Sequence, residues 1–90
     1  LSPAEREIAP GLQHSLQVCA ELIRNGAQDF AALCQDAKSS LSAAGFTPDY
    51  FEIRRGNDLQ LAAPGDTSIA IFAAAKLGKT RLIDNIQLTL

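Results

Sequence analysis

The chain has 90 residues, of which 47% are hydrophobic and 20% charged, and its formal net charge is −2. This length predicts a single domain with a modest core, and the composition argues against disorder. The weakly acidic charge excludes the basic footprint of a nucleic-acid-binding domain, and no apolar run approaches the roughly 20 residues that span a bilayer. The chain lacks methionine, and Leu1 directly before a helix cap is typical either of a cut inside a longer chain or of N-terminal processing.

The first predicted helix begins at Pro3 and ends before Gly26. Ser2 and Glu5 have the spacing of a capping box, with Pro3 at the first helical position. Pro10 has no N–H for the helical ladder, so it should bend this helix. Gly26 supplies a left-handed stop. The apolar stripe at helical spacing consists of Ile8, Leu12, Leu16, Cys19 and Ile23.

A second helix is predicted from a cap at Asp29 to a stop at Gly45. Its apolar side consists of Phe30, Leu33, Cys34, Ala37, Leu41 and Ala44. Phe46 stands where a Schellman motif would bring it back onto Leu41. Because the connection to the first helix is short, we expect the two helices to be antiparallel.

The second half of the chain has the alternating pattern of strands. The predicted segments are a strand at 50–54, a loop at 56–66, a strand at 68–77, a turn at 78–79 and a strand at 80–90. Phe51 and Ile53 share one face of the first strand. The strand at 68–77 is apolar on both faces, which is typical of a central strand.

The turn at Gly78 and Lys79 has glycine first, the type II′ pattern, and therefore fixes the register of the hairpin. The predicted pairs are Ala75 with Leu82, Ala73 with Asp84, Phe72 with Asn85, Ile71 with Ile86 and Ile69 with Leu88. The fold class is thus α+β, with two antiparallel helices packed on a three-stranded antiparallel sheet of order 1-2-3 whose second strand is central.

No residue in this sequence has the setting of a catalyst or a metal ligand. His14 is the single histidine and lies off the apolar stripe, so we interpret it as a solvated helix residue. Cys19 and Cys34 lie on apolar helical faces, which favours reduced core thiols in a cytosolic protein over an inter-helix disulfide. The Gly-Lys-Thr run at 78–80 is followed by a strand rather than a helix, so it is not a phosphate loop.

Lys76, Lys79 and Arg81 form the one local cationic group in the chain. The predicted register places Lys76 opposite Arg81, which costs free energy unless an acid or an anion neutralises the pair. This group is either a soluble hairpin tip or a basic finger that approaches a phosphate or carboxylate in a neighbouring site.

Asp84 interrupts the apolar face formed by its neighbours on the last strand. A buried carboxylate needs hydrogen-bond donors. We therefore predict a structural role for Asp84 and Asn85, either through hydrogen bonds to the backbone or through a bulge that turns them outward, with a contact to a partner domain as the alternative.

Three landmarks of the chain resemble the pantothenate synthetases, in that family's order. They are residues 1–10 (LSPAEREIAP), residues 44–46 with 49–54 (AGF and DYFEIR), and residues 77–85 (LGKTRLIDN). Residues 55–59 depart from the family, which usually has an acidic stretch there.

The resemblance implies that residues 1–90 are the C-terminal lid domain of a ligase that condenses pantoate with β-alanine using ATP. The larger N-terminal domain of the family is Rossmann-like, and its motifs are absent here. It would bind ATP and magnesium and form a pantoyl adenylate, from which β-alanine displaces AMP. The isolated chain would be inactive, with Lys79 and Arg81 as lid residues near the substrate. The intact enzyme would be a cytoplasmic homodimer formed through the other domain.

The rival hypothesis is an independent, non-catalytic protein-binding module. Its basis is the central strand, which is apolar on both faces although the helices can cover only one. Such a module would dock through the uncovered face of the sheet. The codons upstream of Leu1 would discriminate between the two hypotheses.

Overall fold

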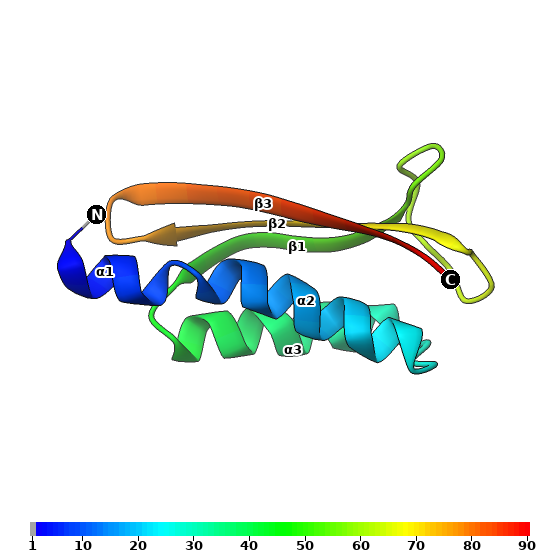
Figure 1. Cartoon of the computed structure of the whole chain (residues 1–90), viewed down its shortest axis with the longest axis horizontal. Coiled ribbons are helices and arrows are strands. Elements are labelled where there is room, and N and C mark those ends of the chain that lie inside the picture. The colour runs from blue at the N-terminus through cyan, green and yellow to red at the C-terminus, as the bar shows by residue number, and fades with distance from the viewer. Residues whose placement is uncertain (1) are drawn as a thin grey trace.

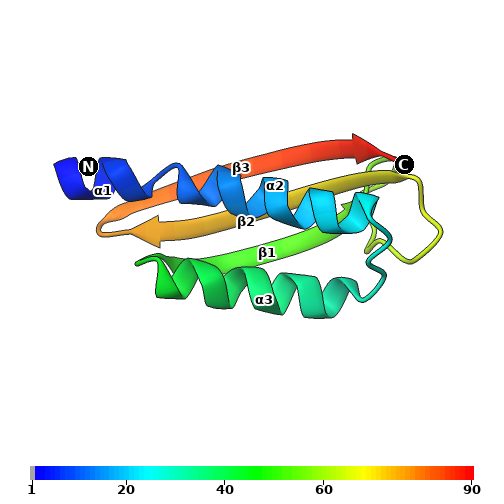
Figure 2. The same ribbon diagram turned by 60° about the horizontal axis from the view of Figure 1, so that its bottom comes forward.

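The computed structural model describes residues 2–90, so Leu1 and the start of the chain lie outside the described residues. The elements are α1 (Pro3–Ile8), α2 (Gly11–Arg24), α3 (Phe30–Ala43), β1 (Thr47–Arg55), β2 (Ser68–Leu77) and β3 (Thr80–Thr89). The strands form one antiparallel sheet of order β1-β2-β3, and the helices cover one of its faces (Figures 1 and 2). The predicted α+β fold is confirmed.

The first helix is divided at Ala9 and Pro10. The capping box is present, because Glu5 Oε1 accepts from the Ser2 N–H at 2.9 Å and Ser2 Oγ accepts from the Glu5 N–H at 3.1 Å. α1 ends at Ile8 and α2 begins at Gly11, where the single bent helix was expected to continue. The reason is that Pro10 has no backbone N–H, so one hydrogen bond of the helix is missing at this point. The backbone of Ala9 and Pro10 nevertheless keeps helical dihedral angles. α1 and α2 together are therefore the long, bent helix.

The end of α3 is a Schellman motif, as predicted. Gly45 has a φ of +107°, and the Phe46 N–H donates to the Leu41 carbonyl at 3.0 Å. The Gly45 N–H donates to the Ser42 carbonyl at 3.2 Å, which completes the motif. Leu41 and Phe46 are both buried, so the motif also turns the chain from α3 into β1 against the core.

The hairpin register agrees with the prediction at every pair, from Ala75 with Leu82 to Ile69 with Leu88. β1 is longer than the predicted strand at 50–54, because it begins at Thr47 and ends at Arg55. It also contains a bulge: Pro48 pairs with Ala75 and Tyr50 with Ala74, so Asp49 has no opposed residue on β2. The sequence pattern did not predict this bulge.

β2 is buried on both faces although the helices lie on one. Ile71 and Ala73 face the helices and are fully buried. On the other side, which we call the open face, Ala70 and Ala74 are also inaccessible to solvent. Ala74 lies between Tyr50 and Ile83 in the register, so longer side chains of the flanking strands shield it.

Candidate functional site

The β2–β3 turn brings Lys76, Lys79 and Arg81 to one end of the sheet. Lys76 and Arg81 are opposed residues, and both point to the open face because their neighbours Ala75 and Leu82 pack on the core. Lys79 occupies the turn itself, and all three side chains are exposed. We call this region, together with Asp49 and Tyr50, the hairpin end.

Arg81 is held by two residues of β1. Its Nε donates to Asp49 Oδ2 at 2.7 Å, and its guanidinium carbon lies 6.0 Å from the centre of the Tyr50 ring, within the range of a cation–π contact. The hydrogen bond to Asp49 raises the pKa of Arg81. Asp49 is thus the acid that relieves the like-charge pair of Lys76 and Arg81.

The turn is supported from the helical side by α1. Gly78 has a φ of +62°, which agrees with glycine at the first position of a type II′ turn. A Cβ atom on Gly78 would overlap with Glu5 Oε2 and lie 3.0 Å from Glu5 Cδ. The carboxylate that closes the capping box of α1 therefore also packs against the hairpin turn, and Figure 1 shows the start of α1 beside it.

The side chain of Asp84 is half-buried. The pairing of β3 with β2 runs without a bulge through Asp84. Its Oδ1 accepts from the Asn85 N–H at 2.8 Å, a hydrogen bond to the adjacent backbone. Asp84 also lines a shallow groove with Arg6 and Gln13 of the first two helices. The bulge alternative is therefore wrong, and the structural role of Asp84 and Asn85 stays a prediction.

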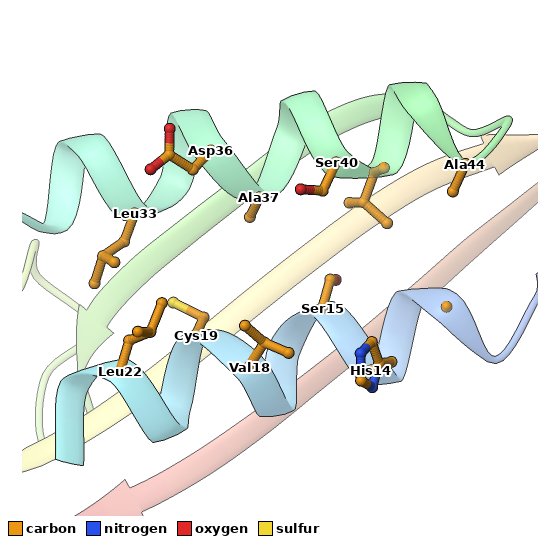
Figure 3. A pocket seen from close by; sticks show the side chains of 12 residues that line it. His14, Ser15, Val18, Cys19, Leu22, Leu33, Asp36, Ala37, Ser40 and Ala44 are labelled. Carbon is orange, nitrogen blue, oxygen red and sulfur yellow. The ribbon is translucent and has the colours of Figure 1, made fainter. Parts of the chain in front are cut away.

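A second hollow, of about 330 Å³, lies between α2 and α3 (Figure 3). Its lining is mostly apolar, with Val18 and Leu22 partly exposed to solvent. His14 and Asp36 lie on opposite sides of this hollow, one on α2 and one on α3, and no ion pair joins them among the described residues. The exposed position of His14 agrees with its interpretation as a solvated residue.

Both cysteines are free thiols, as predicted. Burial raises the pKa of Cys19 to about 12 and also raises the pKa of Cys34. The thiolate is the nucleophilic form of cysteine, and reactive cysteines have lowered pKa values. The direction of both shifts is the opposite of the one that activates a catalytic thiol.

Metal binding has no support within residues 2–90. No three side chains among the histidine, cysteines and acids of this range come together as metal ligands. Magnesium keeps several waters and is usually held by one or two carboxylates together with substrate phosphates. The described residues therefore contain no preformed cage for the magnesium that the resemblance implies for an intact enzyme. None of the described helices has the length and hydropathy needed to cross a membrane.

The fold and the hairpin end define a small two-layer α+β domain whose distinctive surface feature is a supported cationic hairpin. Residues 1–87 match the family model described as pantoate-beta-alanine ligase, and the chain belongs to this family. It is 51% identical over 90 residues to the pantothenate synthetase of Hahella chejuensis and 47% identical over 87 residues to that of Chromobacterium violaceum. The resemblance of the three landmarks to pantothenate synthetases is thereby confirmed.

A solved structure supports the same relationship. A crystal structure of the pantothenate synthetase from Thermus thermophilus superposes with a TM-score of 0.82 at 28% identity, covering 96% of this chain. The chain spans only 31% of that structure and 32% of the Hahella chejuensis relative. The match is therefore to about a third of a pantothenate synthetase.

Proposed function

We propose that this chain is the C-terminal lid domain of a pantothenate synthetase. The proposal is based on how much of each protein the match covers. All of this chain matches the Hahella chejuensis relative, but the match covers only 32% of that relative. The chain belongs to a ligase family, yet residues 2–90 form an α+β unit in which no three potential metal ligands come together and both cysteines have raised pKa values. Such a domain contributes to a reaction whose main binding groups lie elsewhere.

In the proposed enzyme, pantoate is condensed with β-alanine at the expense of ATP through a pantoyl adenylate. An acyl adenylate is readily hydrolysed, so a domain that closes over it and excludes water protects the reaction. The partner of this chain would be a Rossmann-like domain that binds ATP, and that domain would also form the dimer interface of a cytoplasmic enzyme. Magnesium would be held there too, outside the residues described here.

The hairpin end is the part of this domain suited to approach substrate. Lys79 occupies the turn and is exposed, and it takes part in no ion pair among residues 2–90. Arg81 lies beside it on the open face. Both residues are proposed as lid residues near the substrate, where cations would attract carboxylate or phosphate groups.

The experiment that tests the lid compares a complete enzyme carrying this domain with the same enzyme lacking residues 2–90. AMP and pantothenate are measured together in each reaction. With the domain present, we expect one AMP for each pantothenate. Without it, we expect slow turnover and an excess of AMP, because water reaches the adenylate. The purified 90-residue chain should form neither product.

Equal AMP and pantothenate at an unchanged rate in the truncated enzyme would refute the lid role. Pantothenate formation by the chain alone would refute its predicted inactivity. The rival hypothesis of an independent binding module is disfavoured by the open face, where Ala70 and Ala74 are shielded. Among the described residues of the strands, Ile83 is the large hydrophobic side chain that is exposed, and one such residue does not mark an interface. Val18 and Leu22 are exposed on the helical side, where they line the hollow between α2 and α3.

A further inference from the structure

The arginines on the open face differ in how many of their donors the protein uses. Each of the three nitrogens of Arg54 donates within the protein: Nε and Nη2 donate to Glu52 Oε2, and Nη1 donates to the Leu59 carbonyl at 3.0 Å. Arg81 donates to Asp49 through Nε alone. Within the part of the chain that the structure describes, its two terminal nitrogens have no hydrogen-bond acceptor. Arg81 is thus oriented by the protein but keeps the planar fork that binds carboxylates and phosphates.

The bulge in β1 creates this arrangement. In a regular strand, consecutive side chains point to opposite faces. Pro48 pairs with Ala75 on the core side, and the register shift then places both Asp49 and Tyr50 on the open face. The two residues contact the same guanidinium, one through its edge and one through its face. Such re-aiming of side chains is a recurrent use of bulges.

The charge around Arg81 also favours an anion. Three cations, Lys76, Lys79 and Arg81, lie at the hairpin end, where Asp49 is the acid on the open face. Glu52, which also lies on this face, is paired with Arg54. Glu5 approaches the turn from α1, on the helical side. The ion pair with Asp49 is solvent-exposed, with side-chain exposures of 45% and 43%. Exposed ion pairs stabilise proteins little, so orientation of the guanidinium is a better account of the pair than stability.

We propose that the hairpin end binds an oxyanion, a carboxylate or a phosphate group, through the terminal nitrogens of Arg81. Lys76 lies beside Arg81 and adds positive charge, and Asp49 and Tyr50 are positioning residues that hold the guanidinium. The identification of this oxyanion with a substrate of the ligase rests on the proposed function. The oxyanion site itself rests only on the contacts described above.

The test is an NMR titration of the 90-residue chain, with sodium pyrophosphate in one series and sodium acetate in another, at matched ionic strength. We expect saturable shifts of the Arg81 side-chain N–H groups and of the backbone amides at 76–81. A response to pyrophosphate alone identifies a phosphate site, and a response to acetate alone identifies a carboxylate site. Shifts that are absent in both series, or that only follow ionic strength, would overturn the proposal.

Two variants test the chemistry of the site. Arg81→Lys keeps the charge but loses the fork, and we expect affinity to fall about fivefold or more. Arg54→Lys is the matched control on the same face, and it should leave the affinity unchanged. A fall in affinity of similar size in both variants would indicate non-specific attraction and overturn the site. The spectrum of each free variant reports whether its fold is intact.

Asp49→Asn tests whether Asp49 positions Arg81 or only neutralises its charge. The two roles predict changes of opposite sign in the affinity for the anion. If Asp49 only neutralised Arg81, its removal would strengthen anion binding. If it orients the guanidinium, the variant binds the anion about twofold or more weakly, since asparagine does not supply the charge-assisted bond. Tighter binding by Asp49→Asn would therefore overturn the positioning role. The two proposals can fail separately. If the chain binds no anion, but removal of residues 2–90 from the enzyme still produces an excess of AMP over pantothenate, the oxyanion site is refuted and the lid proposal stands.

Discussion

The two ends of the sheet contain similar charged residues but use them differently. At the end opposite the hairpin, which we call the loop end, Arg54 pairs with Glu52 and Arg55 pairs with Asp58. Arg54 also donates to the Leu59 carbonyl of the loop at 56–66. Both arginines are paired with acids two or three residues away, so their charges are neutralised locally and their donors stabilise the loop.

The hairpin end has the opposite character. Its ion pair joins Asp49 to Arg81 across 32 residues of sequence, and it leaves Lys76 and Lys79 without an acid partner among residues 2–90. The comparison teaches that charged residues close in sequence tend to satisfy one another, whereas a pair formed through strand register can orient a cation and leave charge available. Only the second arrangement is suited to binding a ligand.

The largest expected effect comes from Ile71, which lies in the middle of the sheet and supports both ends. Its side chain is fully buried, so Ile71→Ala should lower the free energy of unfolding by about 2–5 kcal/mol. Urea unfolding followed by circular dichroism measures this loss. Ile83→Ala is the control, because Ile83 is 62% exposed and its loss should be about 0.5 kcal/mol or less. Similar losses in both variants would contradict the assignment of the core to the helical face.

The second largest effect is the difference in stability loss between alanine substitutions of one glycine at each end of the sheet. Gly78→Ala places a side chain at positive φ and against Glu5, and we expect a loss of about 1–3 kcal/mol. Gly65, beyond the loop end, also has positive φ, but a Cβ atom there meets nothing within 4 Å. Gly65→Ala should therefore lower the free energy of unfolding only by the cost of the strained backbone, without a steric contribution. Thermal unfolding of the two variants gives the comparison.

A second substitution tests whether the contact with α1 causes the extra loss. Glu5→Ala alone should destabilise the protein, because it opens the capping box of α1. In the Gly78→Ala background it also removes the overlapping carboxylate, so the double variant should lose less stability than the sum of the two single losses. In the Gly65→Ala background the two losses should simply add. Additive losses in both backgrounds would show that the contact with Glu5 does not contribute to the cost of Gly78→Ala.

The hairpin was predictable because its determinants are local. Glycine at the first position of a two-residue turn selects type II′, and this turn sets every pair from Ala75 with Leu82 onward. The Schellman motif at Gly45 and the capping box at Ser2 were likewise readable from residues within one helical turn. The α+β fold then followed from packing apolar helical stripes on one face of the sheet.

The arrangement around Arg81 was not predictable in the same way. The sequence identified Arg81 and Lys79 as a cationic group, but Asp49 lies 32 residues from Arg81 and its role depends on the bulge. A bulge adds one residue to one strand, and the sequence pattern from Tyr50 onward is the same with or without it. Pro48 near the strand start was the one available signal, since proline is tolerated at edges and bulges.

A smaller effect separates the two arginines of the open face. Arg54→Ala removes the donors that hold the loop, and we expect a loss of about 1 kcal/mol, confined to that region. Hydrogen exchange of the Ala62 N–H, which donates to the Ile53 carbonyl, should become faster. Arg81→Ala should leave this exchange and the thermal midpoint unchanged while abolishing anion binding. Unchanged or slower exchange in Arg54→Ala, or a destabilised core in Arg81→Ala, would contradict the proposed division of roles.

The smallest effect is the acid titration of one carboxylate at each end. The backbone N–H of Ser2 holds the pKa of Glu5 below its ordinary value of 4.5, and the backbone N–H of Gln60 holds the pKa of Asp58 below 3.8. Since both values are lower in the folded state, each carboxylate stabilises the fold above its unfolded pKa. That contribution is lost as the pH falls through the folded value.

Ser2→Ala tests whether these two carboxylates are independent. The variant removes the Ser2 hydroxyl, the second cause of the low pKa of Glu5, but keeps the backbone N–H. The pKa of Glu5 should therefore rise part of the way toward 4.5, while that of Asp58 stays unchanged. Carboxyl ¹³C chemical shifts recorded between acid and neutral pH measure both groups in one sample. A shift in the pKa of Asp58 would mean that the ends are coupled through the sheet, and the hairpin end could then not be treated as a separate site.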